Sequence, residues 1–273
     1  MTRYLADMTW REVDALEKDP GVVILPIGAI EQHGHHMPLV TDALIAGKAV
    51  EQALARLPED VPAWALPTMP FGKSNEHVGF AGTVMLSAQT LLAFCHDVAR
   101  SMAAAGFKRL MFVNGHGGNK ALLEMAARDI RAELGLITFV VMPPSLTDAD
   151  RAALPAAEQR FGIHAGTVET SLILADSPEL VKMEHASAHY PAFTADNVHL
   201  TAMPNVAWLS RDWSPKGHFG DATAATAELG QRYWQNIAQG LADIIREAAT
   251  FTIPSTTPST TNSTTADTIV GDV

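Results

Sequence analysis

Short apolar runs alternate with amphipathic segments along the first half of the chain. The clearest run, VVILPI at 22–27, is rich in β-branched residues and ends at Gly28, a pattern typical of a strand buried on both faces. Comparable strands are predicted at 63–66, 109–113 and 137–141. Apolar residues recur at helical spacing over 42–57, 86–105 and 120–134. This repeated alternation of strand and helix predicts an α/β fold with a mainly parallel sheet covered on both faces.

The second half of the chain is less regular. We predict a loop or short helix at 143–155, a helix at 167–175 and a long helix at 222–249. From Thr252 onward the sequence TIPSTTPSTTNSTTADTIVGDV is rich in Thr, Ser and Pro and has no apolar periodicity. The pattern therefore predicts a single α/β domain over 1–251 and a disordered tail over 252–273.

The composition is that of a compact protein without nucleic-acid or membrane partners. Of 273 residues, 47% are hydrophobic and 18% are charged, which leaves little room for extensive disorder. The 30 acidic residues outnumber the 19 basic ones, and the net charge of -11 disfavours binding to nucleic acid or anionic lipid. The N-terminal segment lacks the apolar core of a signal peptide, and no run of about twenty apolar residues follows. We therefore expect a cytoplasmic location.

Two polar loops follow predicted strands, at the edge where ligands bind in open α/β sheets. The first, GAIEQHGHHMPLVTD, supplies Glu31, His33 and Asp42, and the second, NGHGGN, holds His116 between glycines. Mixed carboxylate and imidazole ligands suit zinc, manganese or iron rather than magnesium or calcium. The sequence therefore predicts a transition-metal site, in which the second oxygen of Asp42 either bridges two ions or serves as a helix N-cap.

A third polar cluster, HAGTVETS, begins with His164 and carries Glu169 into a predicted helix. His164 can protonate a leaving nitrogen or stabilise a tetrahedral oxyanion, which would make it a catalytic residue. The alternative is a buried histidine that caps the helix, with Glu169 on a solvated face. The residues themselves leave these two interpretations open.

Taken together, the clusters resemble the creatininase family of metal-dependent amidohydrolases. The matching segments are LPIGAIEQHGHHMPLVTD, VNGHGGN, HAGTVETS and the later GHFGDATAATAELG, in the family's order over nearly the whole chain except the tail. The resemblance implies a three-layer α/β/α sandwich and two divalent metal ions in each subunit, which can be zinc, manganese or iron. It also implies a homo-oligomeric ring, often a hexamer, that acts on a small-molecule substrate.

The resemblance also assigns roles to individual residues. Four residues match the family's metal ligands, the third of them in the bridging place: Glu31, His33, Asp42 and His116. His164 matches a catalytic histidine that contacts the substrate. Glu169 lies beside His164 in the shared motif. It is a candidate catalytic residue, and also a candidate metal ligand or hydrogen-bond partner of a metal ligand. Ser74 and Glu76 lie in the loop where the family binds substrate, although a solvated loop would look much the same.

The chain departs from creatininase at the metal site and at the substrate pocket. In creatininase the histidine of the second loop is followed by a tyrosine and a metal-binding glutamate, whereas Gly117 and Gly118 stand there in this chain. One ligand is therefore missing or supplied from elsewhere, and Glu169 is the first candidate. Creatininase also has a tryptophan where this chain has Arg160, and no tryptophan occurs at 141–155. Creatinine is thus not the expected substrate, and Arg160 can pair with a carboxylate or phosphate of an anionic one.

These features predict a metal-dependent amidohydrolase that cleaves a carbon–nitrogen bond by metal-activated water, with His164 serving the departing nitrogen. The bond can belong to a cyclic amide, a formamide or a peptide, because the glycine-containing loop is similar to family branches that include a formamide hydrolase and a peptidase. The alternative is a nucleotide-binding protein or oxidoreductase. It rests on Gly115, Gly117 and Gly118, which follow a strand as in a dinucleotide fingerprint, although Lys120 replaces the third glycine of that motif.

Overall fold

Four parallel strands form the central sheet of the protein. The computed structural model describes residues 2–254, and its sheet contains β1 (Val22–Ile27), β2 (Ala63–Ala65), β3 (Arg109–Asn114) and β4 (Ile137–Val141). The strand order is β2-β1-β3-β4. Val22 pairs with Ala63 and Arg109, and Arg109 pairs with Ile137, so the four strands begin in register. Because every pairing is parallel, the carboxyl ends of the strands meet at one edge.

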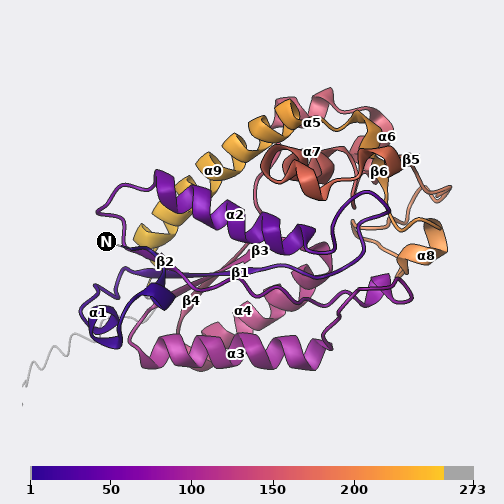
Figure 1. Cartoon of the computed structure of the whole chain (residues 1–273). Coiled ribbons are helices and arrows are strands. Elements are labelled where there is room, and N and C mark those ends of the chain that lie inside the picture. Colours follow the sequence, from indigo (N-terminus) through magenta and orange to yellow (C-terminus); the bar gives the residue numbers. More distant parts are fainter. Residues whose placement is uncertain (1, 255–273) are drawn as a thin grey trace, which may run out of the picture.

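Helices cover both faces of this sheet (Figure 1). α3 (Ala88–Ala104) and α4 (Lys120–Leu134) lie on one side, and α2 (Thr41–Arg56), α7 (Thr167–Asp176) and α9 (Ala227–Thr250) lie on the other. The residues of β1 divide alternately between two apolar cores. Val22 and Ile24 pack with α2 and α9, whereas Val23 and Leu25 pack with α3 and α4. The expected three-layer α/β/α sandwich with a parallel sheet is therefore confirmed.

Most predicted helices and strands form within a few residues of their expected ends, and two differences have a clear cause. The last helix starts later than predicted, because the Thr226 side chain accepts from the backbone N–H of Leu229 at 3.1 Å and caps α9, while Ala222–Ala224 form a separate 3₁₀ turn, η6. The N-cap alternative for Asp42 is wrong. α2 begins at Thr41 after an N-cap at Val40, which leaves the Asp42 carboxylate inside the first turn.

Short elements fill the connections, and most of them leave no clear pattern in the sequence. The short helices are α1 (Trp10–Asp14), α5 (Asp148–Ala153), α6 (Ala156–Phe161) and α8 (Ser210–Trp213). The other 3₁₀ turns are η1 (Leu5–Asp7), η2 (Asn75–His77), η3 (Gly117–Asn119), η4 (Pro178–Leu180) and η5 (Met183–His185). Strands β5 (Ala188–His189) and β6 (Gly220–Asp221) form a small antiparallel sheet.

The described part of the chain ends in a segment without helix or strand. Residues 252–254, where the predicted tail begins, have no regular structure, and the remainder of that prediction lies outside the described residues. Among residues 2–254, no helix combines the length and the apolar character that crossing a bilayer requires.

Two glycines at the strand ends bring the start of α2 against the sheet. Gly28 directly follows β1, and a Cβ there would overlap the backbone of Ala43. Gly115 directly follows β3, and a Cβ there would overlap the carbonyl oxygen of Asp42 and lie 3.1 Å from the Cβ of Ala46. The close approach of these backbones depends on both glycines, and it carries Asp42 to the carboxyl edge of the sheet.

The substitution Gly115→Ala is expected to push α2 away from the sheet. The new Cβ would overlap the carbonyl oxygen of Asp42, and only a shift of the helix can relieve that overlap. We expect the free energy of unfolding to fall by about 1–3 kcal/mol, measured by urea denaturation with far-UV circular dichroism. Gly117→Ala is the matched control in the same loop, since a Cβ there meets no atom within 4 Å. Equal stability of the two variants would contradict this account.

Candidate metal centre

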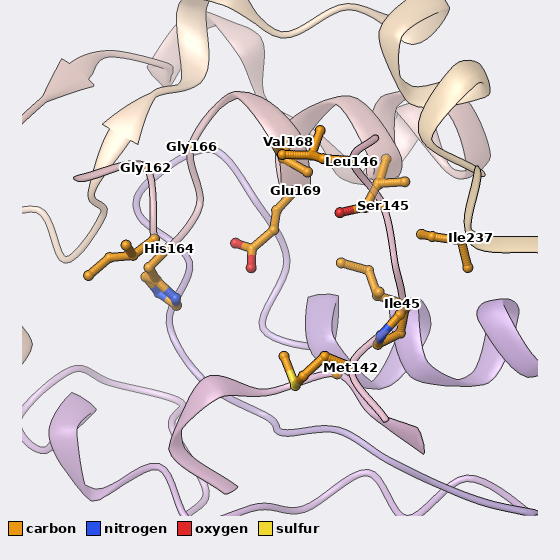
Figure 2. Close-up of a pocket in the computed structure, with 14 residues that line it drawn as sticks. Ile45, Met142, Ser145, Leu146, Gly162, His164, Gly166, Val168, Glu169 and Ile237 are labelled. Carbon is orange, nitrogen blue, oxygen red and sulfur yellow. The ribbon is translucent and has the colours of Figure 1, made fainter. Parts of the chain in front are cut away.

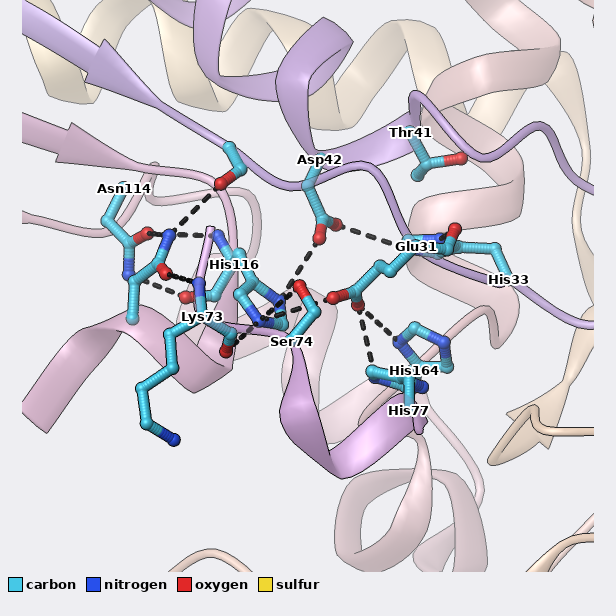
Figure 3. A network of polar contacts seen from close by, with 12 residues as sticks. Glu31, His33, Thr41, Asp42, Lys73, Ser74, His77, Asn114, His116 and His164 are labelled. Atoms are coloured by element: carbon cyan, nitrogen blue, oxygen red, sulfur yellow. Dashed lines mark hydrogen bonds and ion pairs between the residues drawn. The ribbon is translucent and has the colours of Figure 1, made fainter. Parts of the chain in front are cut away.

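The four predicted metal ligands meet at the carboxyl edge of the sheet (Figure 3). Glu31 and His33 lie in the loop after β1, Asp42 in the first turn of α2, and His116 in the turn after β3. The exposed fraction is 0% for Glu31 and His33, 2% for Asp42 and 4% for His116. Burying two carboxylates this completely is costly unless cations or several donors face them.

Asp42 lies between two imidazole rings. Its Oδ1 is 3.1 Å from Nε2 of His33, and its Oδ2 is 3.1 Å from Nδ1 of His116. The ring of His33 is held from its other side, since Nδ1 donates to the carbonyl oxygen of Glu31 at 3.1 Å. One carboxylate oxygen thus faces each side of the centre, which is the arrangement expected of a carboxylate that bridges two ions.

Glu31 is the second buried carboxylate, and three histidines surround it. Its Oε2 lies 3.2 Å from Nε2 of His116, while Oε1 lies 3.1 Å from Nε2 of His77 and 3.7 Å from Nδ1 of His164. These contacts do not have hydrogen-bond geometry, because within residues 2–254 both Glu31 oxygens and Oδ2 of Asp42 lack a hydrogen-bond partner. Nitrogen and oxygen atoms that converge without hydrogen bonds are arranged as ligands of a cation.

The donor atoms fit divalent metal ions. Ligand atoms lie within 4.8 Å of one another in three groups: Glu31, Asp42 and His116; His33, His164 and Glu169; and Glu31, His77 and His164. Atoms that bind one ion at about 2.0–2.2 Å must lie this close together. Their mixture of oxygen and nitrogen suits zinc and manganese. Asp42 belongs to the first group and contacts His33 of the second, so the groups are placed to share it.

The charges of the centre stabilise one another. Burial alone would raise the pKa of Glu31, but the surrounding imidazoles, His116 foremost, outweigh it and hold that pKa well below its usual range. Burial would likewise lower the pKa of His116, yet the nearby carboxylates hold it well above its usual range. In His33, burial is outweighed by Asp42, which raises the pKa to about 9. Glu31 therefore stays ionised in the interior, the state in which a carboxylate binds metal.

His164 belongs to the same cluster rather than to a separate cap. Its Nε2 donates to the carbonyl oxygen of Gln32 at 2.7 Å, which turns Nδ1 toward Glu31. Its ring centroid lies 4.3 Å from that of His33 and 4.4 Å from that of His77. Burial, reinforced by these two neighbouring rings, holds the pKa of His164 well below its usual range. The His164 imidazole is therefore neutral near pH 7.

Glu169 reaches the centre from the first turn of α7, and it is half-buried rather than on a solvated face. Its Oε2 accepts from the backbone N–H of Ala165 at 2.6 Å. Ala165 has a φ of 52°, a left-handed conformation that is uncommon outside glycine and is often found at functional sites. Burial raises the pKa of Glu169 to about 7. The carboxyl group can therefore change its charge near neutral pH.

Glu158 of α6 holds the turn that carries His164, and nothing in the sequence pattern singles it out. Oε1 accepts from the backbone N–H of Thr167 at 2.9 Å. Oε2 accepts from the backbone N–H of Asp221 at 2.8 Å and from the hydroxyl of Tyr190 at 3.0 Å. This buried carboxylate thus joins α6, α7 and β6.

The residues predicted to bind substrate lie in two different places. Ser74 and Glu76 join the cluster, with Oγ of Ser74 3.5 Å and Oε1 of Glu76 3.2 Å from Nε2 of His116. Arg160 is exposed on α6 and donates to the carbonyl oxygen of Ala195 at 3.3 Å. Its role in substrate binding stays a prediction.

His77 is a member of the centre that the sequence prediction does not include. Besides Glu31, its ring contacts Gln32, whose Nε2 is 2.7 Å from Nδ1, and Ser210, whose Oγ is 2.9 Å from the same nitrogen. One signal was available, because His77 directly follows Glu76 in the polar loop after β2. Its partner Ser210 comes from α8, far along the chain, and no local pattern could have indicated that contact.

A cavity of about 200 Å³ opens beside the cluster (Figure 2). The Glu169 carboxylate points into it, and His164 lies at its edge. Aliphatic side chains form much of the remaining lining: Ile45, Met142, Leu146, Val168, Leu172 and Ile237. Apolar walls with a few polar groups are the usual form of a small-molecule site. The cavity can therefore take an uncharged substrate group next to the candidate metal ligands.

The carboxyl edge of the parallel sheet buries a carboxylate between two histidines, beside an apolar pocket. This arrangement fits a metal-dependent enzyme of the α/β class. The family profile of creatininase, described as creatinine amidohydrolase, matches residues 6–245. The chain therefore belongs to the creatininase family, and it is a metal-dependent amidohydrolase that acts on a carbon–nitrogen bond. The nucleotide-binding alternative is not supported, because the glycine-rich turn delivers His116 to the metal centre.

Individual relatives agree with this assignment. A mycofactocin precursor peptide peptidase of Mycobacterium ulcerans (strain Agy99) is 37% identical over 235 residues, which are 84% of this chain and 85% of the relative. Two solved creatininase structures, a manganese form and a Zn–Zn form of a glutamate-to-glutamine variant, have TM-scores of 0.69 and 0.68. Both are 30% identical to this chain, and each match covers 90% of this chain and 98% of theirs.

Asp42→Asn is expected to lower the pKa of His33 in the metal-free protein. In the wild type, burial lowers this pKa and Asp42 raises it by more, to about 9. The pKa of His33 in the folded protein thus exceeds its value of about 6.5 in the unfolded chain. The contact between His33 and Asp42 therefore stabilises the metal-free fold fully below pH 6.5, and this stabilisation is lost as the pH rises through about 9. NMR titration of the His33 ring in chelator-treated protein measures the change. Asp97→Asn removes an exposed carboxylate on α3 and should leave the pKa of His33 unchanged. An unchanged pKa of His33 in Asp42→Asn would contradict the pairing.

Proposed function

We propose that the protein holds two divalent ions and uses them to hydrolyse a carbon–nitrogen bond in a substrate other than creatinine. The observation that carries this proposal is the position of Asp42, whose two oxygens each lie 3.1 Å from a different imidazole, that of His33 and that of His116. Glu31 would complete the site on the side of His116, and Glu169 the site on the side of His33. Zinc, manganese or iron suits these donors. Ions bound there would lower the pKa of a water molecule and polarise the substrate carbonyl.

His164 and Glu169 would carry the protons of the reaction. The neutral ring of His164 can accept a proton and pass it to the departing nitrogen, and its place between two other rings keeps its orientation constant. Glu169, whose carboxylate points into the same cavity, would take up a proton only when it is not bound to an ion, because a metal-bound carboxylate stays ionised. Both side chains line the cavity in which the scissile bond would lie.

The substrate would be a small amide or a short peptide. The aliphatic lining of the cavity favours an uncharged group close to the metal centre. Similarity to a mycofactocin precursor peptide peptidase over 84% of the chain favours a peptide bond, with formamides and cyclic amides as the other candidates. Arg160, exposed near the end of α6, would pair with an anionic group on the part of the substrate that extends toward solvent.

We also propose that the enzyme is a homo-oligomer, as the family resemblance implies. Met203 and Val206 support this proposal, since they are apolar side chains with exposed fractions of 81% and 40% in one loop before α8. A contact between subunits would remove such exposed apolar side chains from water.

Removing the metal ions is expected to abolish activity without unfolding the chain. Turnover is measured on a panel of short peptides, formamides and cyclic amides, before and after chelation and after addition of Zn²⁺ or Mn²⁺. Glu31→Gln and His116→Ala should each lower turnover by about 100-fold or more with an unchanged far-UV circular dichroism spectrum. Glu124→Gln, on the exposed face of α4, is the control. Full activity in a metal-free preparation would falsify the proposal.

Arg160→Gln is expected to affect only substrates that carry a carboxylate or phosphate. Losing one charge-assisted hydrogen bond should raise their KM about 10-fold and leave kcat unchanged, because the contact lies away from the reacting bond. Steady-state kinetics with an anionic substrate and its neutral amide analogue measure this difference. Arg151→Gln on α5, equally exposed, controls for a change of surface charge, and the same KM change for both substrates would argue against a specific contact.

A further inference from the structure

The buried carboxylate of Glu158 caps the helix that carries Glu169. The N-cap residue of α7 is Gly166, which has no side chain with which to cap the helix. Oε1 of Glu158 takes that place, since it accepts from the backbone N–H of Thr167, the first residue of α7, at 2.9 Å. The helix dipole also favours a negative charge at this end. The start of α7, and with it the position of Glu169, therefore depends on a side chain of α6.

The same carboxylate holds the strand that pairs with His164. Oε2 of Glu158 accepts from the backbone N–H of Asp221 in β6 at 2.8 Å. Directly before β6, Phe219 exchanges two backbone hydrogen bonds with His164, at 2.8 and 3.3 Å. The backbone of His164 is thus anchored through this strand, and the turn that follows it is anchored through Thr167. Both anchors end on Glu158.

Three glycines leave room for this carboxylate, which is 3% exposed. A Cβ would lie 2.5 Å from Oε1 of Glu158 at Gly162, 2.6 Å from it at Gly166 and 2.9 Å from it at Gly220. None of these positions can therefore take a side chain while the carboxylate stays in place. The donors that face it are uncharged, namely two backbone N–H groups and the hydroxyl of Tyr190. Burying a charge in this way is costly, but it fixes the direction of two backbone groups, which an apolar side chain could not do.

We propose that Glu158 is a positioning residue for catalysis, which holds His164 and Glu169 at the cavity by fixing the backbone of residues 164–167. His164 and Glu169 come from either side of this turn, and both line the cavity. A displacement of about 1 Å at a reacting group can lower a rate about 100-fold, so such an anchor acts on turnover more than on substrate affinity. The inference rests on the proposed function, because it takes His164 to be a catalytic residue.

Two variants of Glu158 test the proposal through steady-state kinetics. Glu158→Gln offers one acceptor oxygen to the two backbone N–H groups, and Glu158→Leu offers none at a similar size. We expect kcat to fall about 10-fold in Glu158→Gln and about 100-fold in Glu158→Leu, with KM within about twofold of the wild type. The substrate is the member of the peptide and amide panel that the wild type hydrolyses fastest. Tyr190→Phe is the matched control, because it removes the hydroxyl that contacts Oε2 and leaves both backbone contacts, so its kcat should equal that of the wild type.

The ring of His164 provides a second measurement that does not depend on activity. In the wild type its Nε2 donates to the carbonyl oxygen of Gln32 at 2.7 Å, so the chelator-treated full-length chain should contain one tautomer, with the hydrogen on Nε2. ¹⁵N NMR distinguishes the two ring nitrogens. Glu158→Leu should move their signals toward the average of two exchanging tautomers, whereas Tyr190→Phe should keep the wild-type signals. A loss of stability alone would leave the signals of the folded protein unchanged.

The possible results separate this inference from the proposed function. Wild-type kcat and wild-type His164 signals in both Glu158 variants, beside a loss of turnover in His164→Asn, would overturn the positioning role and leave the proposed function standing. Full turnover in His164→Asn would overturn the catalytic role of His164 and the inference with it. An equal loss of kcat in Tyr190→Phe would show that the backbone contacts are not what matters, which also overturns the inference. Far-UV circular dichroism checks folding, and Glu158→Gln carries the test if Glu158→Leu does not fold.

Discussion

The burial of two carboxylates, Glu31 and Asp42, is the constraint on which the rest of the structure depends. Ionised carboxylates persist in a protein interior only where cations or polar nitrogens face their oxygens. Three separate segments supply those nitrogens, through His33 after β1, His77 after β2 and His116 after β3. Each segment is thereby drawn to the same point, and the carboxyl edge of the sheet becomes one connected centre (Figure 3).

The backbone makes this convergence possible from two directions. Parallel pairing places the strand ends side by side, and Gly28 and Gly115 let α2 approach them closely enough for Asp42 to lie between two rings. From the other side, the left-handed turn at Ala165 brings His164 over the centre, and the buried carboxylate of Glu158 ties that turn to its neighbours. The cavity lies between these two parts, so the metal ligands and the substrate pocket share a wall.

The carboxylate of Asp42 lies between two imidazole rings, and side chains from other loops decide what surrounds it. Gly118 removes a side chain beside His116, and Glu76 lies in the space that results. The cavity is lined mainly by aliphatic groups such as Leu146 and Val168. Ions bound at such a centre would polarise any carbonyl, whereas the pocket would decide which carbonyl reaches them.

The sequence by itself determined the α/β sandwich and the two principal ligand loops, because buried parallel strands are continuous apolar runs and because Glu31, His33 and Asp42 share one short segment. Strands β5 and β6 are too short to show a period. Only the tertiary structure joined His77 to Ser210 and Glu76 to the space beside Gly118. Such contacts link distant segments, and their distances depend on how each loop crosses the sheet edge, a property that local sequence patterns do not encode.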